Sequence, residues 1–330
     1  MLADFINGNQ TFIDFQPKYL SLPIFLALVP MTYHIPTLFV MGNIFWVYVR
    51  RKSNDETMNP HVFFIIVMHQ FSSFLYMLSD YANIRISATG LVTSWCASLT
   101  PNHYLKLVFC LSVYFNYLTM SFPFLLGLLR LIPVYYPTDY QKKSVRLVRF
   151  FTPLILIYPL ALMSFMIPAL GVCRPYPAPY SFGAIYIHFQ GSWREMEHWP
   201  FLLCSATIWL LLSIITNTLL YVKLQTLKHT RSKNGRLEKA EFSLTLTTAS
   251  MFVAYLTNFV FLLMWGVMRP YSVYSVAMRP FGNDCDTVIV PWIFFLIHPA
   301  FRRQTRRIRN FVMPIKKVET VHVHSVHSIS

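Results

Sequence analysis

Five ionisable side chains stand inside or directly beside long apolar stretches of this 330-residue chain. Asp80 lies in one stretch with Arg85 at its end, and Arg279, Asp284 and Asp286 belong to another. A charged group within a membrane helix costs about 2.5–3.5 kcal/mol on insertion scales unless it faces a partner, water or the interior of a bundle. Three kinds of chemistry therefore fit these residues: contact with a polar part of a ligand, an ion path, or a permanent ion pair between helices.

Patterns for catalysis or metal binding are missing from the sequence. It has no Gly-x-Ser-x-Gly elbow and no His-Glu-x-x-His helix, and no two catalytic groups stand at a defensible spacing. The histidines are scattered, and His322, His324 and His327 lie in a polar tail. We therefore expect no enzymatic activity, no cofactor and no metal site.

The composition predicts that the elements holding these residues lie in a bilayer. Hydrophobic residues make up 55% of the chain and charged residues only 12%, against roughly 25% charged in an ordinary soluble domain. So few charges could not cover a soluble surface, and the 17% of residues that are Phe, Trp or Tyr would face water. A soluble protein is therefore excluded.

Seven stretches are long enough to cross a membrane, which needs ~20 mostly apolar residues for ~30 Å of hydrocarbon. They cover about 20–49, 61–84, 104–129, 150–171, 200–222, 242–268 and 272–298. The last stretch has a low mean hydropathy because it holds Arg279, Asp284 and Asp286. It is still counted as a membrane span, because the distribution of positive charges requires an odd number of spans.

That reason is the distribution of the 28 Lys and Arg residues, which exceed the 13 acidic residues and give a net charge of +15. Of these cations, 21 lie in the segments 50–60, 130–149, 223–241 and 299–330, and 7 lie on the other side. The positive-inside rule then places the N-terminus outside and the C-terminus inside, which requires an odd number of spans. Because the cations are divided among short segments, we expect no nucleic-acid partner.

The expected organisation is an extracellular N-terminus over residues 1–19, a membrane domain over 20–298 and a cytoplasmic tail over 299–330. Cys96 and Cys173 fall outside the spans on the oxidising side, so we expect a disulfide between them, with two unpaired thiols as the alternative. Asn9-Gln10-Thr11 is the single glycosylation sequon and lies in the outer terminus.

Helical rise predicts that opposite charges meet at one depth. Arg279 lies about 29 Å from His298 at 1.5 Å per residue, near the outer face, and Asp80 and Arg85 occupy the outer end of the second span. These groups form either a ligand pocket or a structural ion-pair network, and a paired site is the less costly without ligand. Further ligand-contact candidates are Tyr114, Asn116, Tyr117, Tyr255, Asn258 and Asn283, together with Asp284 and Asp286. Aromatic and amide groups at midspan more often form hydrogen bonds between helices than contacts with a ligand.

Five strings carry a family resemblance. They are Thr57-Met58-Asn59-Pro60-His61-Val62-Phe63, Gly90-Leu91-Val92-Thr93-Ser94-Trp95-Cys96-Ala97-Ser98, Pro101-Asn102-His103, Arg279-Pro280-Phe281-Gly282-Asn283-Asp284 and Val290-Pro291-Trp292. The chain resembles the nematode serpentine chemoreceptors of class U, within the Srg-type superfamily of G-protein-coupled receptors, from about 20 to 301. The resemblance implies an all-α seven-transmembrane helix bundle in the plasma membrane of sensory neurons. It also implies a small-molecule ligand and a heterotrimeric G protein as partners.

The resemblance also implies G-protein contacts at the inner side, for which the candidates are Arg130, Lys239, Arg302 and Arg303. Arg130 closes the third span, with Leu129 and Leu131 where rhodopsin-like receptors have an acidic residue and a Tyr, so the ionic lock of those receptors is not expected here. The tail over about 300–311 reads as a basic amphipathic helix, which also suits an anionic lipid surface.

The leading hypothesis is a chemoreceptor without catalytic activity, and the alternative is an ion channel or small-solute transporter. Buried carboxylates also mark ion paths. Flux through the purified protein that disappears in Asp284→Asn would favour the alternative.

Overall fold

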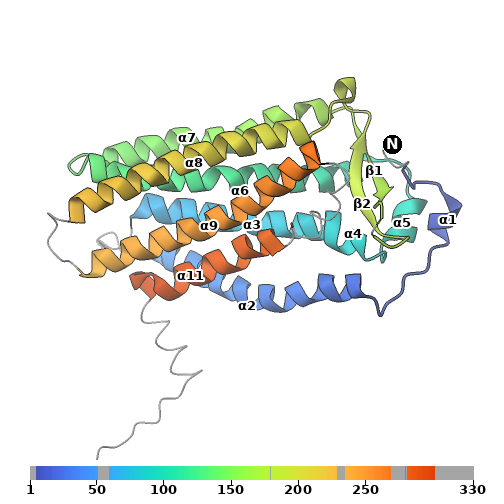
Figure 1. Ribbon diagram of the computed structural model, residues 1–330, viewed down its shortest axis with the longest axis horizontal. Helices are drawn as coiled ribbons and strands as arrows, with labels where there is room; N and C mark the ends of the chain where they lie inside the picture. The colour runs from blue at the N-terminus through green and yellow to red at the C-terminus, as the bar shows by residue number, and fades with distance from the viewer. Residues whose placement is uncertain are drawn as a thin grey trace, which may run out of the picture.

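A computed structural model describes residues 5–50, 59–178, 180–228, 235–268, 279 and 281–301, with no account of the side chains from 227 to 239. Six of the described helices are long and apolar enough to cross a membrane. The long helices are α2 (Leu22–Arg50), α3 (Pro60–Asp80), α6 (His103–Tyr135), α7 (Tyr140–Met163), α8 (Trp199–Lys228) and α9 (Gly235–Val267), and they run side by side (Figure 1). A last helical segment begins at Phe281 and ends in α11 (Val290–Ile297).

Short elements complete the described chain. They are α1 (Gln10–Ile13), a π-helical turn (Tyr81–Arg85), α4 (Ile86–Ala88), α5 (Thr93–Ser98), a second π-helical turn (Cys285–Ile289), and 3-10 turns at Ser164–Met166, Trp193–Glu195 and Pro299–Phe301. Two of the long helices begin at asparagine caps. Asn59 Oδ1 accepts from His61 N at 3.0 Å, and Asn102 Oδ1 accepts from Leu105 N at 2.9 Å. Such caps satisfy amides that have no partner inside the helix.

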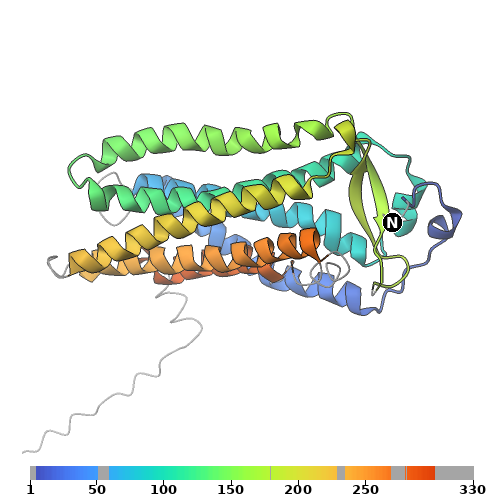
Figure 2. The same cartoon turned by 45° about the horizontal axis from the view of Figure 1, so that its top comes forward.

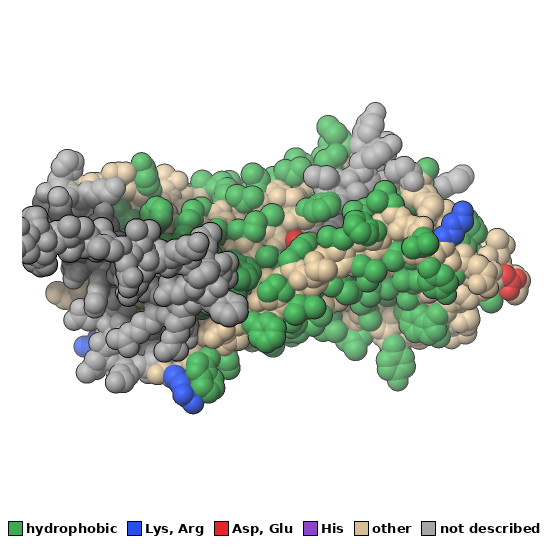
Figure 3. Space-filling view, turned by 90° about the horizontal axis from the view of Figure 1, so that it is seen from below, with side chains coloured by type: hydrophobic (Ala, Val, Ile, Leu, Met, Phe, Trp, Pro, Cys, Tyr) green, Lys and Arg blue, Asp and Glu red, His purple; other side chains and the backbone are tan. Residues whose placement is uncertain are grey.

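Helix α6 is the centre of the bundle. In its apolar window 78% of the residues are buried, against 11% in α7, and α6 lies among the other helices in both ribbon views (Figures 1 and 2). α7 instead leaves Phe150 and Ile157 largely exposed. In Figure 3 hydrophobic side chains cover the middle of the visible face, and the blue Lys and Arg side chains lie toward its two ends. The exposed apolar belt is suited to lipid.

A β-hairpin covers one end of the bundle, called here the hairpin end (Figure 1). Strand β1 (Leu170–Pro175) pairs antiparallel with β2 (Ile185–Gln190), and Cys173 lies opposite Ile187. A disulfide joins Cys96 of α5 to Cys173, with Cα atoms 6.3 Å apart. Gly171 packs so closely on α6 that a Cβ there would lie 2.1 Å from the Lys106 amide nitrogen, so no larger residue fits.

The N-terminal segment 5–15, called here the strap, lies over the disulfide. Ile6 N donates to Cys173 O at 2.9 Å, and Gly8 N donates to Ala97 O at 2.7 Å. The Asn7 side chain donates to the carbonyl of Cys96 at 3.1 Å and accepts from Cys173 N at 3.1 Å. The strap therefore ties both sides of the disulfide together.

Two expectations need correction, and one element was not expected. Residues 170 and 171 belong to β1 rather than to the fourth span, because the chain turns after Met166 and pairs with β2. The unexpected element is the hairpin itself. Arg130 does not close the third span, since α6 continues to Tyr135 and Leu131 is still buried against the bundle.

Candidate functional site

Four of the predicted charges meet in a buried network near the hairpin end. Arg85 donates to both carboxylate oxygens of Asp284, at 3.0 and 2.6 Å, and its Nε lies 3.4 Å from Asp80 Oδ2. Arg279 Nη2 lies 4.0 Å from Asp80 Oδ1. A forked arginine–carboxylate pair combines strong hydrogen bonds with a fixed orientation, and Asp80 is completely buried.

Two π-helical turns position these charges. Arg85 ends the turn Tyr81–Arg85, and Asp286 lies in the turn Cys285–Ile289 directly after Asp284. Single π-helical turns inside longer helices are frequent at functional sites. Each turn adds a residue to the helix, which changes the direction of the side chains on either side of it.

The carboxylates of Asp284 and Asp286, both in the last helical segment, contact different helices. Asp284 accepts from the Tyr33 hydroxyl of α2 in addition to Arg85. Asp286 faces α3, where His69 Nε2 lies 3.0 Å from Oδ1 and Ser73 Oγ donates to Oδ2 at 2.7 Å. The predicted charges therefore hold α2, α3 and the last segment together, as a structural network would.

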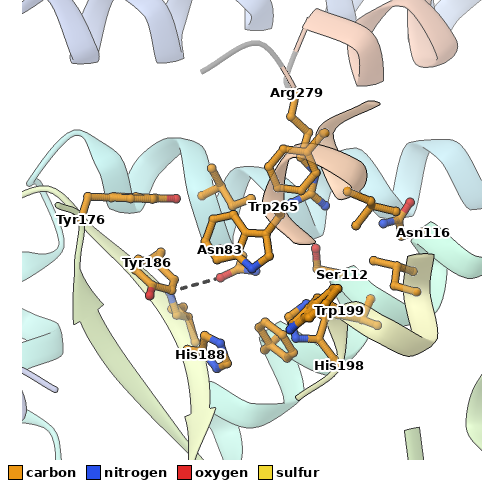
Figure 4. Close-up of a pocket in the computed structure, with 17 residues that line it drawn as sticks. Asn83, Ser112, Asn116, Tyr176, Tyr186, His188, His198, Trp199, Trp265 and Arg279 are labelled. Atoms are coloured by element: carbon orange, nitrogen blue, oxygen red, sulfur yellow. Dashed lines mark hydrogen bonds between the residues drawn. The ribbon is translucent and has the colours of Figure 1, made fainter. Parts of the chain in front are cut away.

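A cavity of about 80 Å³ lies beneath the hairpin, next to this network (Figure 4). Its lining residues come from the hairpin, from the π-helical turn Tyr81–Arg85, from α6, α9 and the start of α8, and from the region just before the last helical segment. They are Asn83, Ile84, Phe109, Ser112, Val113, Asn116, Tyr176, Tyr186, Ile187, His188, His198, Trp199, Leu202, Phe261, Leu262, Trp265 and Arg279. An apolar cavity with a few convergent polar groups is the usual form of a small-molecule site.

Arg279 belongs to both the cavity and the ion network. Its Nε donates to the Tyr76 hydroxyl at 3.2 Å, and its guanidinium lies 5.0 Å from the centre of the Phe261 ring on α9. Any group that binds in the cavity can therefore reach the network through this one side chain.

The hairpin wall is fixed to the second span. Asn83, in the π-helical turn, accepts a hydrogen bond from Ile187 N at 3.2 Å, drawn as a dashed line in Figure 4. Together with the disulfide and the strap, this bond holds the hairpin in one position over the cavity.

Two histidines of the cavity are neutral at physiological pH. Burial, reinforced by the positive charge of Arg279, lowers the pKa of His198 to about 4. Burial also lowers the pKa of His188 well below its usual value, with His198 and Arg174 adding to the effect. Both side chains lie outside the membrane-spanning helices, on the hairpin and just before α8.

Only Asn116 and Arg279 among the predicted ligand contacts line this cavity. Asn116 Oδ1 accepts from Asn258 Nδ2 at 2.7 Å. The remaining midspan tyrosines lie elsewhere: Tyr114 donates to Leu156 O at 3.1 Å, Tyr255 donates to Ala206 O, and Tyr117 is buried in the core. A second cavity of about 20 Å³ is lined by Asn116, Tyr255, Asn258, Asn283 and Asp286.

Sequence reasoning missed the hairpin residues of the cavity, Tyr176, Tyr186, Ile187 and His188. The available signal was the sequence Ile185-Tyr186-Ile187-His188-Phe189-Gln190, in which every second residue is Ile or Phe, because a period of two marks a strand. The stretch is too short to stand out as an apolar segment of helix length.

Arg130 lies at the opposite end of the bundle, buried between α6 and α9. It donates to the Thr248 hydroxyl at 3.2 Å, to the Thr245 hydroxyl at 2.6 Å and to the Glu241 carbonyl at 3.4 Å. The other predicted G-protein contacts, the side chain of Lys239 and residues Arg302 and Arg303, lie outside the described residues, as does nearly all of the expected tail helix over 300–311. Asn9, in the strap, is exposed.

The fold is that of the seven-transmembrane receptors of rhodopsin type. A crystal structure of squid rhodopsin matches with a TM-score of 0.61 at 12% identity, covering 92% of this chain and 85% of that chain. The likeness at this identity shows the fold alone. It agrees with the expected mostly helical membrane bundle.

The chain belongs to the serpentine type 7TM GPCR chemoreceptor Sru family, whose model matches residues 6–304. It is 35% identical over 264 residues to serpentine receptor class U-26 of Caenorhabditis elegans, covering 78% of this chain and 91% of that protein. The predicted class U resemblance is confirmed. The protein is therefore a multi-pass membrane receptor and not a member of an enzyme family.

Proposed function

We propose that this receptor binds a small molecule in the cavity at the hairpin end and signals to a heterotrimeric G protein at the opposite end. The observation that carries the proposal is the cavity itself, which lies under a disulfide-tethered hairpin and adjoins a buried charge network. Rigid walls fix the positions of the binding groups before the ligand arrives, which reduces the entropic cost of binding.

Helices α6 and α9 connect the two ends. Asn116 of α6 and Phe261 of α9 line the cavity, and Arg130 of α6 bonds to Thr245 and Thr248 of α9 at the opposite end. A ligand that binds one arrangement of these helices more tightly than another shifts the equilibrium between them. The shift then breaks or keeps the Arg130 contacts that the G protein meets.

The charge distribution supports an orientation with the hairpin end outside the cell. In that orientation the disulfide Cys96–Cys173 lies on the oxidising side and the sequon at Asn9 is accessible to glycosylation. The cation-rich segments, including the tail over 299–330, then lie inside, where the 300–311 region would contact the anionic leaflet and the G protein. The plasma membrane of a sensory neuron is the matching location.

Ligand-driven G-protein activation in reporter cells tests the proposal, with Arg130→Ala as the variant. We expect the variant to lose most of the ligand response at matched surface expression. Arg149→Ala is the control, because Arg149 is an exposed cation on α7 and should leave the response unchanged. Undiminished signalling in Arg130→Ala would contradict the role assigned to Arg130.

A further inference from the structure

We propose that the ligand of the cavity is a small monocarboxylate with an apolar or aromatic body, whose carboxylate pairs with Arg279. The inference rests on the proposed function and specifies its ligand class. It follows from the charge, the unpaired donors and the size of the cavity.

The charge of the cavity walls excludes a cationic ligand. Among the described lining residues Arg279 is the one ionised side chain, because none is Asp or Glu and both His188 and His198 are neutral. An ammonium group placed here would meet a guanidinium and no carboxylate. A carboxylate would gain a charge-assisted hydrogen bond with the fork geometry that arginine offers.

Arg279 is held more loosely than the other arginine of the network. Its nearest carboxylate oxygen, Asp80 Oδ1, is 4.0 Å away, whereas Arg85 lies 2.6 Å from Asp284. Asp80 Oδ1 accepts no hydrogen bond within the described part of the chain. The pair Arg279–Asp80 is thus beyond hydrogen-bond distance, and Arg279 is held instead by bonds from its Nε and Nη2 to the neutral Tyr76 hydroxyl. A ligand carboxylate can replace this neutral acceptor more easily than it can replace the carboxylate that fixes Arg85.

Two further polar groups of the cavity walls have no partner among the described residues. Asn116 is 1% exposed, and its Nδ2 donates to no described residue although its Oδ1 is bonded to Asn258. His198 Nδ1, which donates or accepts according to the tautomer of the neutral ring, is likewise buried and without a described partner. A buried polar group left unpaired costs about 1–3 kcal/mol. Ligand oxygens would satisfy them, and Figure 4 shows Asn116, His198 and Arg279 on different sides of the cavity.

The size and the apolar walls limit the rest of the ligand. A volume of about 80 Å³ holds several water molecules, which suits a body of one ring or a short alkyl chain. Phe109, Trp199 and Trp265 supply flat apolar surfaces for such a body.

Pairing of a ligand carboxylate with Arg279 would also change how the helices contact one another. The ligand carboxylate competes with Asp80 for Arg279, while Asp80 keeps its contact with Arg85 at 3.4 Å. Pairing with the ligand would therefore loosen the link between the last helical segment and α3. A link that changes with occupancy is what a receptor needs in order to prefer one helix arrangement.

The test uses purified receptor in lipid nanodiscs and two matched trios of probes. Phenylacetate, phenylacetamide and 2-phenylethylamine share one body, and hexanoate, hexanamide and hexylamine share another. We expect an acid to raise the unfolding temperature in at least one trio, with the amide at least tenfold weaker and the amine without effect. Equal or tighter binding of an amide or amine overturns the proposal, and so does the absence of binding by both acids.

Variants assign the preference to Arg279. Arg279→Gln should weaken the acid at least tenfold and remove its advantage over the amide, whereas Arg194→Gln, at an exposed position of the same end, should change neither. If Arg279→Gln does not fold, Asn116→Leu is the second variant and should weaken acid and amide alike. Retained acid preference in a folded Arg279→Gln overturns the proposal, as does unchanged acid and amide binding in Asn116→Leu.

The experiments distinguish an error in the ligand class from an error in the proposed signalling role. Acid binding without G-protein activation leaves the ligand class standing and contradicts the signalling role. Activation by an amine or amide alone leaves the receptor function standing and contradicts the ligand class.

Discussion

Buried arginines stabilise the two ends of the bundle in different ways. At the hairpin end Arg85 is forked onto Asp284, an ion pair within 2.6 Å. At the opposite end Arg130 donates to the hydroxyls of Thr245 and Thr248 and to a main-chain carbonyl. The first arrangement pairs opposite charges, and the second relies on neutral acceptors.

The difference bears on which end can move. Breaking a buried ion pair leaves an uncompensated charge and costs about 3–5 kcal/mol in one step. The three hydrogen bonds of Arg130 can instead be exchanged one at a time, each contributing about 1.5–3 kcal/mol. A threonine hydroxyl is also replaced easily by water or by a partner's acceptor. The hairpin end is thus suited to hold a fixed site, and the Arg130 contact is suited to open.

The largest expected effect comes from breaking the ion pair. Asp284→Ala should lower the free energy of unfolding by about 3–5 kcal/mol, because Arg85 stays buried without its forked partner. Thermal unfolding in nanodiscs measures the loss. The double variant Asp284→Leu with Arg85→Met should recover part of it, since both members of the forked pair are removed and Asp80 loses only its 3.4 Å contact with Arg85. A double variant as unstable as Asp284→Ala would contradict the pairing argument.

The second prediction is that the stability of the hairpin end depends on pH through His198. The pKa of His198 is about 4 in the folded protein and about 6.5 when unfolded, so the folded state binds fewer protons between these values. Stability therefore falls as the pH drops through that window, by about 2 kcal/mol from pH 7 to pH 5.

The variant His198→Phe should flatten this pH dependence. The groups that face His198 are Arg279 and His188, and His188 adds a loss of the same sign because its pKa is lowered too. Unfolding at a series of pH values measures the slope. An unchanged slope in His198→Phe would show that His198 is not buried neutral.

The third prediction concerns the opposite end. Thr245→Val removes one acceptor of Arg130 and should destabilise the resting arrangement by about 1.5–3 kcal/mol, with a rise in basal G-protein activation. The control is Thr226→Val, which loses a similar bond to its own helix on exposed α8. Unchanged basal G-protein activation together with normal stability would show that the Thr245 hydroxyl does not stabilise the contact between α6 and α9.

The smallest effect is expected between the two ends. Asn258→Ala removes the hydrogen bond to Asn116 and should cost about 0.6 kcal/mol, the average for such bonds between membrane helices. Asn43→Ala, on the exposed face of α2, should cost nothing measurable. A loss as large as that of Asp284→Ala would mean that neutral contacts stabilise this bundle as strongly as charges do.

The convergence of the charged residues was predictable, whereas the cavity was not. Counting residues along a helix gives depth directly, so Asp80, Arg85, Arg279 and Asp284 could be placed at one level. The roles of Tyr176 and His188 depend on a strand register, Cys173 opposite Ile187, which no helical period reveals. The partners of Arg130 were equally hidden, because the rotation of α9 about its axis decides which threonines face it.

The strap also sets an order of events during synthesis. The Asn7 side chain bonds to residues 89, 92 and 166 positions later in the chain, so its contacts cannot close until β1 has been made. At about 5–20 residues per second, that interval lasts roughly 8–33 s. Asn9 would remain unrestrained for this time, and in the proposed orientation this is when a glycosylating enzyme would reach it before the N-terminus is fixed over the disulfide.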